Sequence, residues 1–352
     1  MSIRLSNPGC STLFRVFAVS LLSLGILSSA PRASAQSELV PLISGGGGFF
    51  TSTNGGNTSY IPTVAPVLAA PLGRNVLIES RANLLEDFFP PGGGKPYDHT
   101  HFIGVAYIQA DYFVTSHFTV VGGYFITPFG TYNERLAPIW ISNLQDAPLI
   151  NPLGAMGGAA LGGQVRGNAY SNSHVSLDYA AYYSGRSSNE QIASQRATGF
   201  KFEAYFPKQQ LEVGYSFGRV LQGTNTSANG LHVWWTPEKI PLKIRSQYSH
   251  GAHSQGYWIE TDYRLSKFGG AESPLGRLEP VFRMQQTFRN SAGSDGLPGQ
   301  DTQRADFGFD YHLPHEVRIN TSYARQFSQT GNKNVWETGI VYRFLLPTWK
   351  GK

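Results

Sequence analysis

A period-2 alternation of apolar and polar side chains recurs along this chain in segments of about ten residues, the strand length that spans a bilayer. Residues 304–313 place Phe307 and Phe309 on one side and Asp306 and Asp310 on the other. Successive side chains of a strand point to opposite faces, whereas a helix would scatter these residues around its axis. Strands with one apolar and one polar face are typical of a transmembrane β-barrel.

Fourteen segments carry this pattern, with turn-forming residues between them. They lie near 75–86, 102–114, 117–127, 161–171, 174–184, 197–206, 210–220, 230–236, 240–249, 256–265, 277–289, 303–313, 316–327 and 334–345. Segments 44–53 and 58–72, around the turn signal at 54–57, form a candidate additional hairpin. Its prolines, Pro62, Pro66 and Pro71, would have to sit at edges or bulges. We favour sixteen strands over fourteen, because sixteen is typical of water-filled barrels.

The N-terminus predicts a cleaved export signal over residues 1–35. Arg4 and Arg15 flank the start, residues 16–27 are apolar, and Ala33-Ser34-Ala35 is a small-x-small cleavage site. A transmembrane anchor needs about 20 apolar residues, more than this run offers. We divide the rest into an N-terminal segment, 36–58, which is a candidate first strand, and a transmembrane barrel, 59–352.

Charge and cysteine content exclude several classes of function. The net charge of +5 falls to +2 if Arg4, Arg15 and Arg32 leave with the signal, and no block is dense in lysine or arginine. We therefore expect no nucleic-acid partner. Cys10, the only cysteine, precedes the apolar run of the signal. A cysteine-based metal site or redox function is then unavailable to the exported chain.

The longest stretch without alternation is 128–160. Loops of this size inside a compact domain are usually functional. We predict that it folds into the lumen and narrows the pore; a lid over the outer mouth is the alternative. The residues that we assign to the constriction are Tyr132, Glu134, Arg135, Trp140 and Asp146.

Strand parity predicts which charged residues line the lumen. Tyr342 and Phe344, taken as lipid-facing, set the parity of the last strand, and the apolar face sets it elsewhere. So many inward charges indicate water inside, and their near balance of sign predicts weak charge selectivity. The inward residues are Glu79, Arg81, Arg166, Asp178, Lys201, Glu203, Glu212, Lys243, Arg245, Glu260, Asp262, Arg264, Arg283, Arg304, Asp306, Asp310, Arg318, Glu337 and Arg343.

Four of these bases lie on three adjacent predicted strands. Lys243, Arg245, Arg264 and Arg283 could form one basic wall. Pairing across strands with acids such as Glu260 and Asp262 is the alternative.

The last predicted strand carries a second pattern. Glu337, Gly339, Tyr342 and Phe344 follow the spacing polar-x-Gly-x-x-aromatic-x-aromatic. This resembles the C-terminal β-signal by which outer-membrane proteins are recognised for insertion, although eight residues follow Phe344. The resemblance implies the barrel-assembly machinery as a partner, with Gly339, Tyr342 and Phe344 as the signal. An ordinary amphipathic edge strand is the alternative.

Sequence motifs for a metal site or a catalytic site are weak. His99 with His101, and His250 with His253, could each supply two ligands on a probable outer loop, but no third ligand is evident, so we expect no metal and no cofactor. No Gly-x-Ser-x-Gly motif is present. We expect no catalytic residue, although a barrel hydrolase with Asp and His at the outer rim stays open.

Residues 125–141, FITPFGTYNERLAPIWI, preceded by a strand like 117–124, resemble the corresponding strand and loop of the phosphate-selective porin O/P-like group of bacterial outer-membrane proteins. The resemblance implies a sixteen-stranded channel for small solutes, with anions as candidates. We predict an all-β, up-and-down antiparallel barrel in the outer membrane, a porin passing small hydrophilic solutes or ions by passive diffusion. Its partners would be outer-membrane lipid and those solutes, with monomer and homotrimer both open. A barrel hydrolase, or a structural or adhesive barrel plugged by its loop, are the alternatives.

Overall fold

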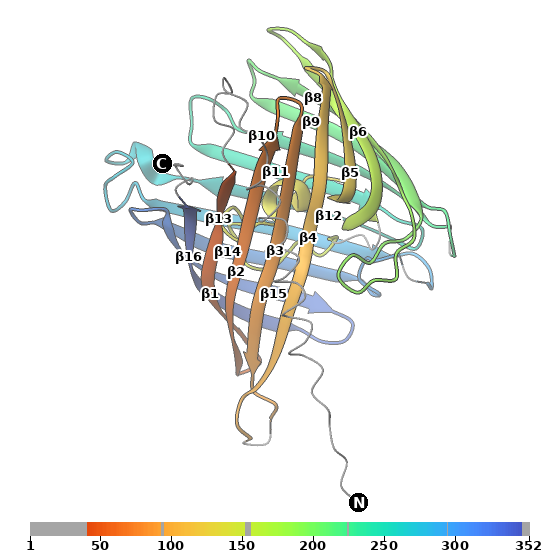
Figure 1. Ribbon diagram of the computed structural model, residues 1–352. Coiled ribbons are helices and arrows are strands. Elements are labelled where there is room, and N and C mark those ends of the chain that lie inside the picture. Colours follow the sequence, from red (N-terminus) through yellow and green to blue (C-terminus); the bar gives the residue numbers. More distant parts are fainter. Residues whose placement is uncertain (1–40, 93–94, 152–155, 224, 294, 347–352) are drawn as a thin grey trace, which may run out of the picture. The chain divides into compact units, whose positions relative to one another are not determined.

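The computed structural model describes residues 41–92, 95–151, 156–223, 225–293 and 295–346. The predicted export signal, 1–35, lies outside these ranges. Sixteen antiparallel strands form a closed barrel in which each strand pairs with its neighbours in sequence and β1 pairs with β16 (Figure 1). They are β1 Leu42–Asn54, β2 Asn57–Leu72, β3 Val76–Phe89, β4 Asp98–Thr115, β5 Phe118–Ile126, β6 Ala159–Ser171, β7 Ser176–Ser184, β8 Ala197–Phe206, β9 Leu211–Val220, β10 Ser227–Trp235, β11 Leu242–His250, β12 Ser254–Tyr263, β13 Leu278–Arg289, β14 Thr302–His312, β15 Val317–Ser328 and β16 Lys333–Leu346. The prediction of sixteen strands is confirmed.

The additional N-terminal hairpin is present as β1 and β2. The ladder between β2 and β3 has no pair at Pro62 or Pro66, whereas Thr63 pairs with Leu85 and Val67 pairs with Arg81. Proline has no N–H to donate, and at these two positions β2 makes no ladder pair with β3. Pro71, by contrast, pairs with Leu77 within the regular ladder.

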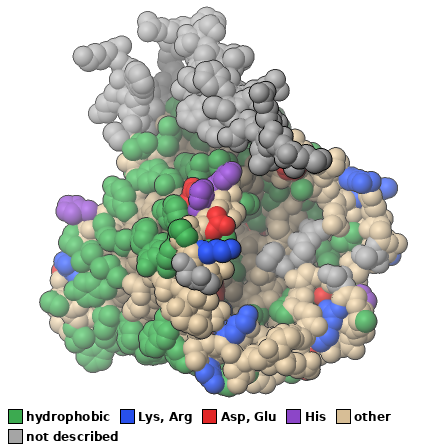
Figure 2. All heavy atoms as spheres, turned by 90° about the horizontal axis from the view of Figure 1, so that it is seen from below, with side chains coloured by type: hydrophobic (Ala, Val, Ile, Leu, Met, Phe, Trp, Pro, Cys, Tyr) green, Lys and Arg blue, Asp and Glu red, His purple; other side chains and the backbone are tan. Residues whose placement is uncertain are grey.

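The two faces of the barrel differ in polarity. In β14, Phe307 and Phe309 point outward and are exposed, whereas Arg304, Asp306 and Asp310 point inward and are buried. Hydrophobic side chains crowd the outer flank at the left of Figure 2. Such an outer face is suited to lipid. Within the described residues, no helix is long and apolar enough to cross a membrane.

The two ends of the barrel carry connections of different length. At the end where β1 begins and β16 ends, which we call the short-turn end, all connections have six residues or fewer except 264–277. The opposite, long-loop end carries 127–158, 185–196 and 290–301. In outer-membrane barrels the short turns face the periplasm.

The loop 127–158 joins β5 to β6 and folds back into the barrel, where its single π-helical turn, η1 (Tyr132–Leu136), is visible in Figure 1. Backbone N–H groups of the loop donate to inward side chains: that of Gly130 to Ser216 Oγ at 3.1 Å, and that of Leu149 to Gln285 Oε1 at 2.7 Å. The loop therefore lies inside the barrel rather than across its mouth.

Apolar side chains of this loop pack directly on inward-facing glycines of the wall. A Cβ added at Gly230 would lie 3.2 Å from Phe129, and one at Gly218 would lie 3.0 Å from Met156. The same close approach joins Trp140 to Gly46, Leu144 to Gly308 and Ile150 to Gly256. A side chain at any of these glycines would press on a loop atom and require it to shift, so the glycine-rich inner wall helps to position the loop.

Candidate functional site: the charged lumen and the in-folded loop

The π-helical turn of the loop is bound to β8 and β9 by ion pairs. Arg135 lies 2.6 Å from Glu212 and 3.2 Å from Glu203, and its guanidinium also lies 5.6 Å from the ring centre of Trp234. Lys201 pairs with Glu134 and lies 3.2 Å from Glu203. Two predicted constriction residues, Glu134 and Arg135, are thus held against the wall.

His232 on β10 completes this group. Its Nε2 lies 3.2 Å from Glu203 and 3.5 Å from Glu212. These three side chains could in principle hold a metal ion, since their ligand atoms lie within 4.8 Å of one another. Arg135 and Lys201 already neutralise both carboxylates, so the arrangement is better suited to ion pairing than to a metal.

Cross-strand pairs occupy the place where the sequence allowed a basic wall. Arg245 lies 2.8 Å from Glu260 and also pairs with Asp262. Lys243 lies 3.0 Å from Asp262 and 3.1 Å from Glu279. The bases of β11 are therefore paired with acids of β12 and β13. The structure contains cross-strand ion pairs here, which was the alternative to a basic wall.

The next part of the network connects β13, β14 and the loop. Arg283, fully buried, lies 3.5 Å from both Glu260 and Asp306, and it donates to the backbone oxygen of Asp146 at 2.7 Å. Arg304 lies 2.6 Å from the Asp146 carboxylate and 2.7 Å from Asp306. Asp146, a predicted constriction residue, is thus shared by two arginines of the wall.

The tip of the loop is held by Arg318 on β15. This guanidinium donates to the backbone oxygens of Ile139 and Ser142 and to Asn143 Oδ1, and it lies 3.5 Å from Asp310. Asn143 in turn donates to Asp262 at 3.1 Å. Buried charges held by this many partners rigidify the elements that they join.

Tyr132 and Glu337 occupy buried positions at the edge of this network. Tyr132 packs edge-on against Trp258, with ring centres 6.5 Å apart, and burial raises the pKa of its phenol, which stays neutral. Glu337 accepts a hydrogen bond from Ser322 at 3.2 Å.

On the opposite wall the charges are fewer. Arg166 lies 2.7 Å from Asp111 and borders a cavity of about 550 Å³ that Glu134 and Arg135 of the loop also line. Arg264 and Arg343 take no part in the paired network; they line a second cavity, described below.

Three charged or titratable lumen residues were missed from the sequence: Asp111, His232 and Glu279. Each points inward within a strand that had been predicted, and Glu279 has the same parity as Arg283. Parity applied without exception would have found all three.

The predicted assembly signal lies at the seam that closes the barrel. Tyr342 and Phe344 face outward on β16, and Phe344 pairs with Gly45 of β1. Gly339 faces inward, where Phe50 packs over it.

The described rim does not present a competent hydrolase triad. Ser291 Oγ lies 2.9 Å from His253 Nδ1, but Asp295 accepts from the backbone N–H of His253, at 2.8 Å, rather than from its ring. A catalytic aspartate has to orient the imidazole, and this one does not.

The fold is that of outer-membrane porins. The chain is similar to Salmonella typhi OmpF solved with daunomycin (11% identity over 86% of this chain and 97% of that one, TM-score 0.56) and to the anion-selective porin from Comamonas acidovorans (9%, 87% and 98%, TM-score 0.52). It is also similar to the trimer form of OmpT, an outer membrane protein of Vibrio cholerae (9%, 86% and 99%, TM-score 0.56). At these identities the likeness concerns fold alone. No protein-family model and no curated protein matched the sequence.

Glycine contacts provide a test of the loop's placement. We expect the double variant Gly218→Val/Gly230→Val to displace Met156 and Phe129 and so to loosen the loop, because those side chains are the nearest neighbours of the added atoms. Single-channel records should show a higher or noisier conductance, and limited proteolysis should cut within 128–151.

The matched control is Gly122→Val/Gly163→Val. A Cβ at either glycine would have no neighbour closer than 3.7 Å. Equal behaviour of the two double variants would contradict the inferred role of the glycine contacts.

Proposed function

We propose that this chain is a bacterial outer-membrane porin that lets small hydrophilic solutes and ions diffuse passively through its lumen. The observation that carries the proposal is the contrast between an apolar outer face and an inner wall of ionisable, mostly ion-paired side chains around a closed sixteen-stranded barrel. Charges at that density require water, and the outer face requires lipid.

In this proposal the loop 127–158 forms the constriction. Its ion pairs with β8 to β15 hold it against one wall, and the cavity of about 550 Å³ between the loop and β3–β8 belongs to the solute path. Arg166, Glu134 and Arg135 line that path. The charges that hold the loop against the wall are those of Lys201, Arg283, Arg304 and Arg318.

Weak charge selectivity follows from the pairing. Lys243, Arg245 and Arg283 lie within ion-pair distance of acids, so little net field remains along that wall. The similarity of residues 125–141 to the porin O/P-like group supports a relationship to that group, and the pairing favours general diffusion over phosphate selectivity.

We also propose two partners. The trimer form of Vibrio cholerae OmpT shares this fold, which supports a homotrimer. The pattern of Gly339, Tyr342 and Phe344, at the closing seam, supports recognition by the barrel-assembly machinery.

Planar-bilayer recording of the purified protein tests the function. We expect stable single-channel steps and a reversal potential close to zero in a potassium chloride gradient, because acids and bases nearly balance. A barrel plugged by its loop, or a hydrolase, would give no steps. A strongly anion-selective reversal potential would instead contradict the weak selectivity and favour the phosphate-selective group.

A further inference from the structure

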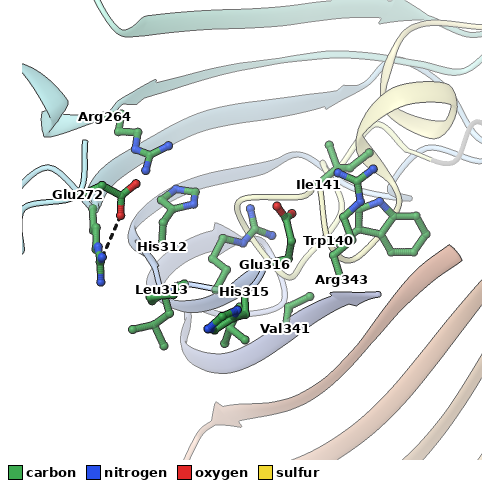
Figure 3. A pocket seen from close by; sticks show the side chains of 14 residues that line it. Trp140, Ile141, Arg264, Glu272, His312, Leu313, His315, Glu316, Val341 and Arg343 are labelled. Carbon is green, nitrogen blue, oxygen red and sulfur yellow. Dashed lines mark hydrogen bonds and ion pairs between the residues drawn. The ribbon is translucent and has the colours of Figure 1, made fainter. Parts of the chain in front are cut away.

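A cavity of about 480 Å³ lies at the short-turn end of the barrel, and its lining comes from four separate elements (Figure 3). Trp140 and Ile141 come from the tip of the loop, and Arg264 from the start of the unusually long connection 264–277. The turn between β14 and β15 contributes His315 and Glu316, and β16 contributes Val341 and Arg343. The volume is in the range of sites for small molecules.

Two guanidinium groups in this cavity lack an acidic partner among the described residues. Arg264 uses only its Nε, which donates to the backbone oxygen of Gly276 at 3.2 Å, and within the described part of the chain no hydrogen bond or ion pair involves the Arg343 side chain. By contrast, Arg277 in the same lining lies 2.9 Å from Glu272, drawn as the dashed line in Figure 3. Elsewhere in the lumen arginines are typically paired, so these two are candidates for an anion.

The turn beside them has an unusual backbone. His315 and Glu316 are consecutive non-glycine residues with φ of 61° and 60°. Glycine or asparagine is the usual residue at such positions, and a strained backbone tends to occur at functional sites. Both side chains line the cavity. Glu316 has no ion pair among the described residues, so the unpaired groups, two arginines and one glutamate, leave one positive charge.

The remaining lining is mixed. His312, which lies 2.6 Å from Glu279, and Arg318, which lies 3.5 Å from Asp310, are polar. Trp140, Ile141, Leu313 and Val341 form the apolar part of the lining. Trp140 packs on Gly46 of β1, where an added Cβ would lie 2.6 Å from the indole. A planar aromatic surface next to unpaired guanidinium groups suits a ligand with one apolar part and one anionic part.

We propose that this cavity binds a small monocarboxylate with an aromatic or apolar body, at the exit of the pore. The carboxylate accepts from Arg264 or Arg343, whose planar donors match it in a bidentate geometry, and the body lies against Trp140. A single negative charge balances the excess of the unpaired groups, whereas Glu316 and the apolar side chains beside Trp140 oppose a phosphate dianion. This deepens the proposed porin function, since it names a solute class for the channel.

Calorimetric titration of the detergent-solubilised protein with benzoate tests the site. We expect saturable binding of benzoate, with at least tenfold weaker binding of benzamide, its neutral counterpart, and of inorganic phosphate. Either Arg264→Gln or Arg343→Gln, whichever removes the guanidinium that holds the carboxylate, should weaken benzoate binding about tenfold, as the loss of one charged hydrogen-bonded contact predicts. Arg74→Gln, in the β2–β3 turn at the same end and outside the cavity, should leave it unchanged.

Trp140 has its own matched pair of variants. Gly46→Ala forces the indole to move and should weaken benzoate binding, whereas Gly47→Ala adds a methyl group whose nearest neighbour is 3.8 Å away and should not. This pair keeps the test valid if Arg343→Gln, close to the assembly signal, fails to assemble.

Equal binding of benzamide or phosphate would overturn the proposal. Benzoate binding that neither arginine variant weakens, or that is equal in Gly46→Ala and Gly47→Ala, would overturn it as well. Calorimetry together with planar-bilayer recording separates this failure from that of the porin proposal. A barrel that conducts but does not bind benzoate is a porin without this site, and one that binds benzoate but never conducts is not a porin.

Discussion

Deleting residues 134–146 is expected to raise the single-channel conductance severalfold and to admit larger solutes. The deletion removes the last three residues of η1 and the loop tip, including Arg135, Asn143 and Asp146, which fill part of the lumen. The flanking strands β5 and β6 keep their ladder with each other, so the barrel should remain closed. Planar-bilayer recording and polymer-exclusion measurements check the result.

The folded state of the deletion variant is its control. An unheated sample should still migrate differently from a heated one in electrophoresis, because the wall charges that lose loop partners keep partners on the wall: Arg304 keeps Asp306, and Lys201 keeps Glu203. Unchanged conductance in a folded barrel would show that the loop does not limit the pore.

Phe344→Asp is expected to reduce assembled protein in the membrane many-fold while leaving the purified chain able to refold in detergent. Phe344 is the third residue from the end of β16, and a charge near the edge of the lipid layer costs only about 1 kcal/mol. That cost is too small to unfold the barrel. A large loss in cells would therefore arise from failed recognition of the last strand by the assembly machinery.

Phe307→Asp is the matched control. Phe307 also faces outward, but it lies in the middle of β14 and outside the signal. Its charge sits deeper in lipid and should cost more stability in detergent, yet it should reduce membrane levels less than Phe344→Asp does. If both variants lost membrane levels in proportion to their stability in detergent, β16 would be an ordinary strand.

The strands themselves were predictable from the sequence. The segment predicted near 303–313 is observed as Thr302–His312, and that near 102–114 as Asp98–Thr115. Alternation with period 2 is a local property, because it depends only on which face of the strand each side chain takes. The same parity assigned Asp306, Asp310 and Arg318 to the inner wall.

The ion pairs were not predictable in this way. Strand parity predicts that Arg283, Arg264 and Arg343 all face inward. In the structure Arg283 lies between Glu260 and Asp306, whereas Arg264 and Arg343 lack an acidic partner among the described residues. Which acid faces a given base depends on register between strands and on loop residues distant in sequence.

The sequence by itself determined that this chain forms a barrel with an apolar outside and a charged inside, because both follow from a repeat that each strand carries alone. Only the tertiary structure decided where the long loop lies, since its position depends on contacts between Trp140 and Gly46, or Phe129 and Gly230, over long sequence separations. The sequence around a strand glycine does not indicate which loop side chain will pack on it, because that contact forms only when the strands close into a barrel. The physical reason is that packing is a relation between distant surfaces, whereas alternation is a property of one strand.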